Sequence, residues 1–152
     1  MMRWRLILIV LSVVAFITPS KAQNFYAGRG TGLDLNVLTL LGVRVADTGW
    51  LPPAGGHLAV SVGAGSLTSG PTTVVSTGIM ISETTGAAGV VNSYSQVDGL
   101  RLFPGLTPAL DLVRATVVRS DATANLASYG GSSTITNLMV LGSSVTVTGA
   151  VN

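Results

Sequence analysis

The chain has 152 residues, enough for one domain with a sizeable core but short for two. Hydrophobic residues make up 47% and charged residues 9%, so hydroxyl, amide and glycine residues must form much of the surface. The sequence has no cysteine, and after residue 22 it has five arginines against six acidic residues, which excludes disulfides, thiolate zinc sites and a basic surface for nucleic acid.

The first 22 residues have the three parts of a secretory signal peptide. Arg3 and Arg5 supply positive charge, residues 6–17 form an apolar run, and small residues precede an expected cleavage between Ala22 and Gln23. The run spans roughly 18 Å, whereas the hydrocarbon core of a bilayer is roughly 30 Å thick. We therefore expect cleavage, no transmembrane segment after signal removal, and a protein that is secreted or held at the cell surface.

From residue 23 onward, β-branched residues alternate with small or polar ones, and turn-forming residues interrupt them at short intervals. We expect residues 23–152 to form a single Gly/Thr/Val-rich, all-β domain of about eight short strands. These would pack as an antiparallel β-sandwich or a barrel-like sheet, with a β-solenoid as the alternative. The expected strands are Gly32–Leu41, Val43–Asp47, His57–Ala64, Thr72–Ser82, Val90–Val97, Leu110–Asp121, Thr134–Leu141 and Ser144–Val151.

Glycine-containing segments predict the turns between these strands. They include Ser69–Pro71, Thr85–Gly86, Asp98–Gly99, Gly130–Gly131 and Gly142. The one helix candidate, Leu106–Val113, is weakened by Pro108. Because the chain stops at Asn152 within an alternating run, we expect a C-terminally truncated domain whose missing tail could attach it to the cell envelope.

Three segments are similar in residue pattern to a known group of exported bacterial proteins. They are Ala27–Leu33, Gly99–Leu106 with the alternating run behind it, and Gly131–Val140. In these segments the chain resembles the choice-of-anchor P family. The resemblance implies a secreted or surface-attached domain with no defined enzymatic activity, whose relatives carry different C-terminal sorting tails. It carries over no functional residues.

Trp50 and His57 are the only ligand candidates, and both are weak. His57 is the single histidine, and a hydrolase would need a nucleophile and an acid beside it, for which no G-x-S-x-G motif gives a sign. Trp50 stands in an apolar loop that could stack on a sugar or, as we favour, close over a sheet end. We therefore predict no catalytic residue.

The remaining motifs favour turns over ligand sites. Asp47–Gly49 and Asp98–Gly99 are interpreted as turns and not as calcium loops, and no metal or cofactor is predicted. The spaced glycines Gly28, Gly30 and Gly32 are interpreted as a flexible lead-in and not as a phosphate loop.

These observations favour a non-catalytic extracellular or cell-surface domain with a structural or adhesive role. The alternative is a secreted carbohydrate-binding module or hydrolase that uses Trp50 and one or two carboxylates. Because few charges protect the expected edge strands, self-association is a further candidate interaction.

Overall fold

The computed structural model describes residues 25–37, 41–105 and 111–147. No helix in these ranges is long and apolar enough to cross a membrane. The eleven strands are β1 (Thr31–Val37), β2 (Leu41–Asp47), β3 (Gly56–Val62), β4 (Gly65–Ser69), β5 (Thr72–Thr77), β6 (Met80–Ala87), β7 (Val90–Leu102), β8 (Val113–Asn125), β9 (Tyr129–Thr136), β10 (Met139–Val140) and β11 (Ser143–Ser144).

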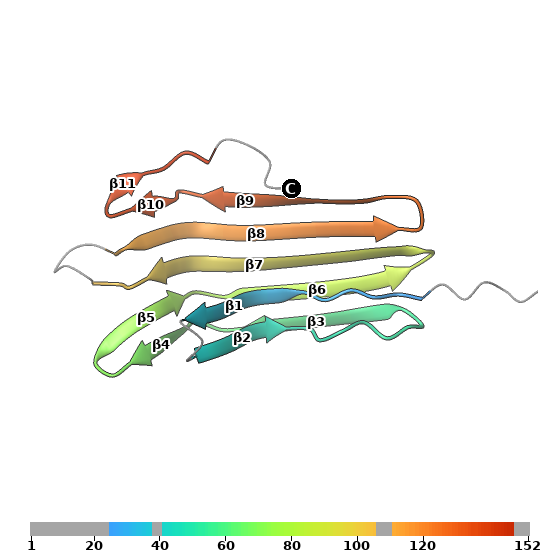
Figure 1. Cartoon of the computed structure of the whole chain (residues 1–152), viewed down its shortest axis with the longest axis horizontal. Helices are drawn as coiled ribbons and strands as arrows, with labels where there is room; N and C mark the ends of the chain where they lie inside the picture. Colours follow the sequence, from blue (N-terminus) through green and yellow to red (C-terminus); the bar gives the residue numbers. More distant parts are fainter. Residues whose placement is uncertain (1–24, 38–40, 106–110, 148–152) are drawn as a thin grey trace, which may run out of the picture.

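Nine strands form one antiparallel sheet around β7 and β8, each of which has 13 residues. Strands β5 and β6 follow one another along one edge of β7, and β9 and β10 follow one another along the far edge of β8 (Figure 1). The sheet continues through β3 beyond β6, β4 beyond β5 and β11 beyond β10. Its strands run side by side without closing, so it is neither a barrel nor a solenoid.

The hairpin of β1 and β2 lies on one face of this sheet, over β3, β6 and β7 (Figure 1). The core between the two layers contains Ala46 from the hairpin and Met80 and Val97 from the sheet, each 4% exposed. Partly buried apolar residues surround these three: Leu33, Val45, Val60, Val62 and Leu100. The fold is therefore sandwich-like, with a second layer that covers only part of the first.

The residues whose side chains face the hairpin are odd-numbered on β5 and even-numbered on β6. Met80, Ser82 and Thr84 are buried on β6, whereas Val75 and Thr77 are buried on β5. Regular strands alternate without such a change, so the backbone must depart from the pleat between β5 and β6.

Two glycines make this departure possible. A Cβ on Gly78 would lie 3.0 Å from the carbonyl oxygen of Asp98, and Gly99 has a φ of 57°, a region that glycine adopts at little cost. Strand β7 continues through both Asp98 and Gly99, where the sequence predicted a turn. That prediction is wrong because neighbouring strands pair with β7 along both of its edges.

The prediction of an all-β, antiparallel fold is confirmed, while several boundaries differ. Residues 72–82 span two strands, β5 and β6, and not one. The predicted turns at Thr85–Gly86 and Gly130–Gly131 lie inside β6 and β9, because the ladders with β3 and β8 extend through them. Strands β7 and β8 are longer than expected for the same reason, since each has partners on both sides.

Several predictions fall partly on residues that the structure does not describe. Residues 38–40 of the predicted strand Gly32–Leu41 and Leu110 of the predicted strand Leu110–Asp121 lie outside the described ranges. Of the helix candidate, residues 106–110 lie outside the described ranges, and Val113 begins β8. The predicted last strand is wrong for residues 145–147, which belong to no strand, since β11 ends at Ser144. Residues 148–151 lie outside the described ranges.

Replacing the buried Met80 by alanine should lower the free energy of unfolding by about 2–5 kcal/mol, because a cavity opens beneath the hairpin. The neighbouring residue Ile79 is 50% exposed, and Ile79→Ala should cost less than about 1 kcal/mol. Urea unfolding of the two variants measures both values. Equal losses would show that the hairpin does not cover Met80.

Candidate functional site

Trp50 and His57, the ligand candidates from the sequence, lie on different surfaces. Trp50 follows β2 in the hairpin layer and is 68% exposed, with the guanidinium carbon of Arg29 at 5.8 Å from its ring centroid. His57 lies on β3, and its Nε2 is 3.1 Å from Oε1 of Glu83. Val60 of the same strand packs toward the hairpin, so by alternation His57 faces the opposite side. The two residues therefore do not form one site.

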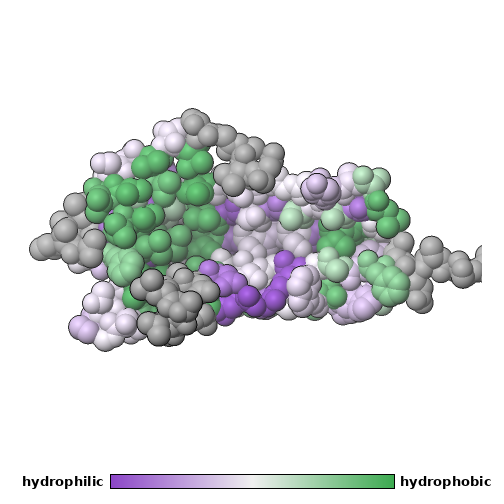
Figure 2. Space-filling view, in the orientation of Figure 1, coloured by the Kyte–Doolittle hydropathy of each residue, from purple (hydrophilic) through white to green (hydrophobic). Residues whose placement is uncertain are grey.

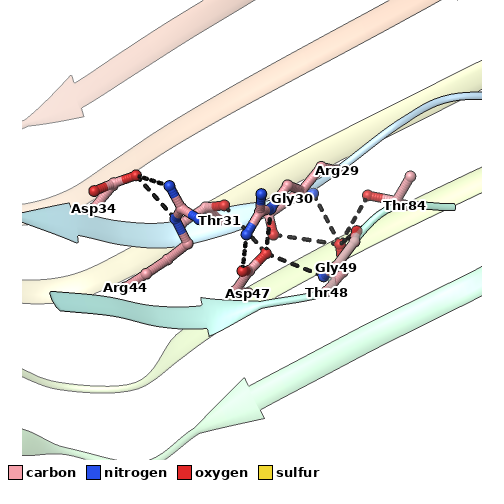
Figure 3. Close-up of polar contacts among 9 residues, drawn as sticks. All are labelled: Arg29, Gly30, Thr31, Asp34, Arg44, Asp47, Thr48, Gly49 and Thr84. Atoms are coloured by element: carbon pink, nitrogen blue, oxygen red, sulfur yellow. Dashed lines mark hydrogen bonds and ion pairs between the residues drawn. The ribbon is translucent and has the colours of Figure 1, made fainter. Parts of the chain in front are cut away.

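Beside Trp50, Arg29 and Asp47 form a bidentate ion pair (Figure 3). Nε of Arg29 donates to Oδ1 of Asp47 over 2.7 Å, and Nη2 donates to Oδ2. The amide of Gly49 donates to the same carboxylate over 3.0 Å, which closes the turn expected here. The hydrogen bonds from Arg29 hold the pKa of Asp47 well below its ordinary value, against the opposing effect of desolvation.

Hydroxyl groups connect this corner to the main sheet (Figure 3). The amide of Thr48 donates to the carbonyl of Gly30, and the amide of Gly30 donates to Oγ1 of Thr48, both over 2.9 Å. Oγ1 of Thr48 lies 3.4 Å from Oγ1 of Thr84, a fully buried side chain that also accepts from Ser93 over 3.1 Å. These bonds satisfy hydroxyls that would otherwise be costly to bury.

Gly28 and Gly30 pack against the main sheet, so the prediction of a flexible lead-in is wrong. A Cβ on Gly30 would lie 3.1 Å from the carbonyl oxygen of Tyr94 and 3.2 Å from Cβ of Ser82. A Cβ on Gly28 would lie 2.5 Å from Cγ1 of Val91. Glycine is required because the entering backbone lies directly on the sheet.

On the opposite face, Tyr94 lies at the centre of a polar surface that the sequence analysis missed. The ladders place Glu83 of β6 and Asp121 of β8 directly across from Tyr94. The guanidinium carbon of Arg119 lies 5.0 Å from the ring centroid, and this group donates to both carboxylate oxygens of Asp121 over 2.6 and 2.9 Å. Arg119 thereby lowers the pKa of Asp121.

We call the surface of Glu83, Asn92, Tyr94, Asp121 and Thr123 the Tyr94 face. These residues line a shallow depression of about 170 Å³, and Oγ1 of Thr123 donates to Oδ1 of Asn92 over 2.8 Å. An aromatic ring flanked by carboxylate, amide and hydroxyl groups can stack on an apolar surface and exchange hydrogen bonds with hydroxyl-rich ligands.

One signal for this surface was present in the sequence. Asn92, Tyr94, Gln96 and Asp98 stand at every second position of β7, so a polar face of this strand is readable from its alternation. The partners on β6 and β8 were not readable, because they depend on strand register.

Within the described ranges, no three His, Asp or Glu side chains lie close enough together to hold a metal ion. The predicted cleavage residues, Ala22 and Gln23, lie outside those ranges. No family model, curated protein or solved structure matches this chain.

Replacing Asp47 by asparagine should lower the urea midpoint at pH 7, and this difference from the unchanged chain should shrink below about pH 4. An unfolded aspartate binds a proton near pH 3.9, whereas folded Asp47 stays ionised to lower pH. Its stabilisation is thus fully present above the unfolded pKa and is lost as the pH falls through the folded one.

Asp34→Asn serves as the control, since Asp34 pairs with Arg44 at an exposed position and should matter less. Midpoints measured between pH 7 and pH 2.5 decide the outcome. A difference for Asp47→Asn that stays constant over this range would contradict the role of the ion pair.

Proposed function

We propose that the chain is an exported, non-catalytic domain that acts as a structural or adhesion module outside the cell. Its N-terminal sequence supports export, and its likeness to the choice-of-anchor P family supports surface attachment. The observation that carries the non-catalytic part is the pairing of its charges. Among the described residues, His57 contacts Glu83, and four arginine–aspartate ion pairs occur: Arg29–Asp47, Arg44–Asp34, Arg101–Asp111 and Arg119–Asp121.

Pairing with arginine keeps these carboxylates ionised, which is unfavourable for a catalytic general acid. A glycosidase needs one carboxyl whose pKa is raised so that it can act as a general acid. Guanidinium groups instead lower the pKa of Asp47, Asp111 and Asp121. The hydrolase alternative therefore has the weaker physical support.

Carbohydrate binding is the second candidate function, and the Tyr94 face favours it. The sheet presents Tyr94 between Glu83 and Asp121 on a broad surface, which suits an extended polysaccharide better than a deep pocket would. Sugar rings stack their apolar faces on aromatic side chains while their hydroxyls bond to carboxylates and amides. From the sequence, Trp50 was the candidate for sugar stacking, although closure over a sheet end was favoured. That favoured interpretation is wrong, because Trp50 is 68% exposed and its ring lies beside the guanidinium of Arg29.

A binding and turnover assay tests both candidates. Labelled chain of residues 23–152 is incubated with cell-envelope fractions and insoluble polysaccharides, and bound protein and released sugar are measured. We expect binding without sugar release, and Tyr94→Ala should weaken polysaccharide binding about tenfold, which corresponds to about 1.4 kcal/mol. Tyr129→Ala is the control, because Tyr129 is 92% exposed on β9, outside the Tyr94 face.

Two outcomes would count against these proposals. Sugar release that Glu83→Gln or His57→Ala abolishes would overturn the non-catalytic function. Equal binding by Tyr94→Ala and the unchanged chain would remove the Tyr94 face as the carbohydrate site and leave the adhesion proposal in place.

A further inference from the structure

Among the described residues, the face that carries the hairpin also has a groove of about 1020 Å³ that the hairpin does not cover. Its lining is mixed: apolar residues, among them Leu100, Ala115, Ile135, Leu138, Val145 and Val147, alternate with polar ones that include Arg101 and Arg114. Figure 2 shows the corresponding hydrophobic area beside the hairpin, over the ends of β7 and β8 and over β10. We call this the apolar groove.

The apolar groove is continuous with the core. Leu100 packs against the cluster of Ala46, Met80 and Val97 beneath the hairpin and also lines the groove. Farther out, Ile135 is 39% exposed. The groove is thus the part of the interlayer space that the second layer does not cover.

The hairpin ends beside this groove with a strand that can accept another. Strand β1 contacts β7 and β6, whereas β2 contacts β6 and β3, so β1 is the hairpin strand nearer to β8 (Figure 1). In the described part of the chain, β1 has β2 as its sole ladder partner. A strand added to β1 would lie over β8 and β9 and cover the groove.

Strand β9 is suited to that position. It pairs with β8 along one edge, all eight of its residues are exposed, and it contains no charged residue and no proline. Charges and prolines are the usual means by which edge strands avoid pairing with other chains. Among residues 25–37, 41–105 and 111–147, β8 is the one strand that pairs with β9, so the second edge of β9 is open to another strand.

We propose that the apolar groove binds a second copy of this chain in a two-fold symmetric dimer. Each copy lays its uncovered β8–β9 region on the groove of the other, and its β9 edge arrives beside the other copy's β1. The arrangement is closed, because the two uncovered faces cover each other and the two hairpins flank them. In the dimer, the main sheet of each chain supplies the second layer over the part of the other chain's sheet that the hairpin does not cover. The dimer does not depend on the proposed function.

Light scattering tests the dimer by measuring the molar mass of residues 23–152 in solution over a range of concentrations. We expect a dimer for the unchanged chain and a dissociation constant raised about a hundredfold or more in Ile135→Lys, because the new positive charge adds to those of Arg101 and Arg114 in each groove. Ile79→Lys is the matched control, because Ile79 is an exposed isoleucine outside the groove, and this variant should remain dimeric.

Hydrogen exchange locates the interface independently of these variants. Amides of β9 and β1 should gain protection as the concentration rises, while those of β3 should not change. Ser133→Lys on β9 provides a second disruptive variant should Ile135→Lys fail to fold, as judged by circular dichroism. A monomeric unchanged chain, or a dimer that protects β3 in place of β9 and β1, would overturn the proposal.

Discussion

The close approach of the N-terminal segment to the main sheet at Gly28 and Gly30 positions the rest of the structure. Sheets in a sandwich normally lie about 10 Å apart, because side chains fill the space between them. Here two glycines let the entering backbone lie directly on Ser82 and Thr84. The hydroxyl of Thr84 bonds to Thr48 across the layers, and that of Ser82 bonds to Ser95 within the sheet. The hairpin is thereby held over one half of the sheet, and Met80 and Val97 become core residues.

This constraint gives the two faces of the sheet different properties. The hairpin face combines the apolar core around Met80 and Val97 with the buried hydroxyls of Ser82 and Thr84. The hairpin covers only part of this face, so the groove beside it is suited to further packing. The opposite face carries Tyr94, the contact between His57 and Glu83, and the ion pair of Arg119 with Asp121. These polar groups need no covering layer, because each has a partner on the same face. The change in alternation at Gly78 and Gly99 places both Val97 and Leu100 of β7 on the hairpin face.

The sequence predicted local properties well and long-range ones poorly. Alternation identified an all-β chain, and the spacing of glycines and prolines located most of its strands. It could not distinguish the Gly99 that continues a strand from a glycine that ends one, because the difference depends on the partners on either side. Likewise, the polar alternation around Tyr94 was readable, but the register that brings Glu83 and Asp121 beside it was not. Trp50 and His57 stood out for their rarity, which carries no information about what surrounds them.

The two proposed surfaces are compatible because they occupy opposite faces of the same sheet. A dimer formed through the hairpin faces would leave both Tyr94 faces exposed, and they would point away from each other. Two sites on one side of a molecule can bind the same surface together and gain affinity from their effective concentration. Two sites on opposite sides cannot, so they connect separate polysaccharide chains or separate surfaces. Such a dimer would therefore act as a cross-linker, which agrees with a structural or adhesive role better than with binding of a single soluble sugar.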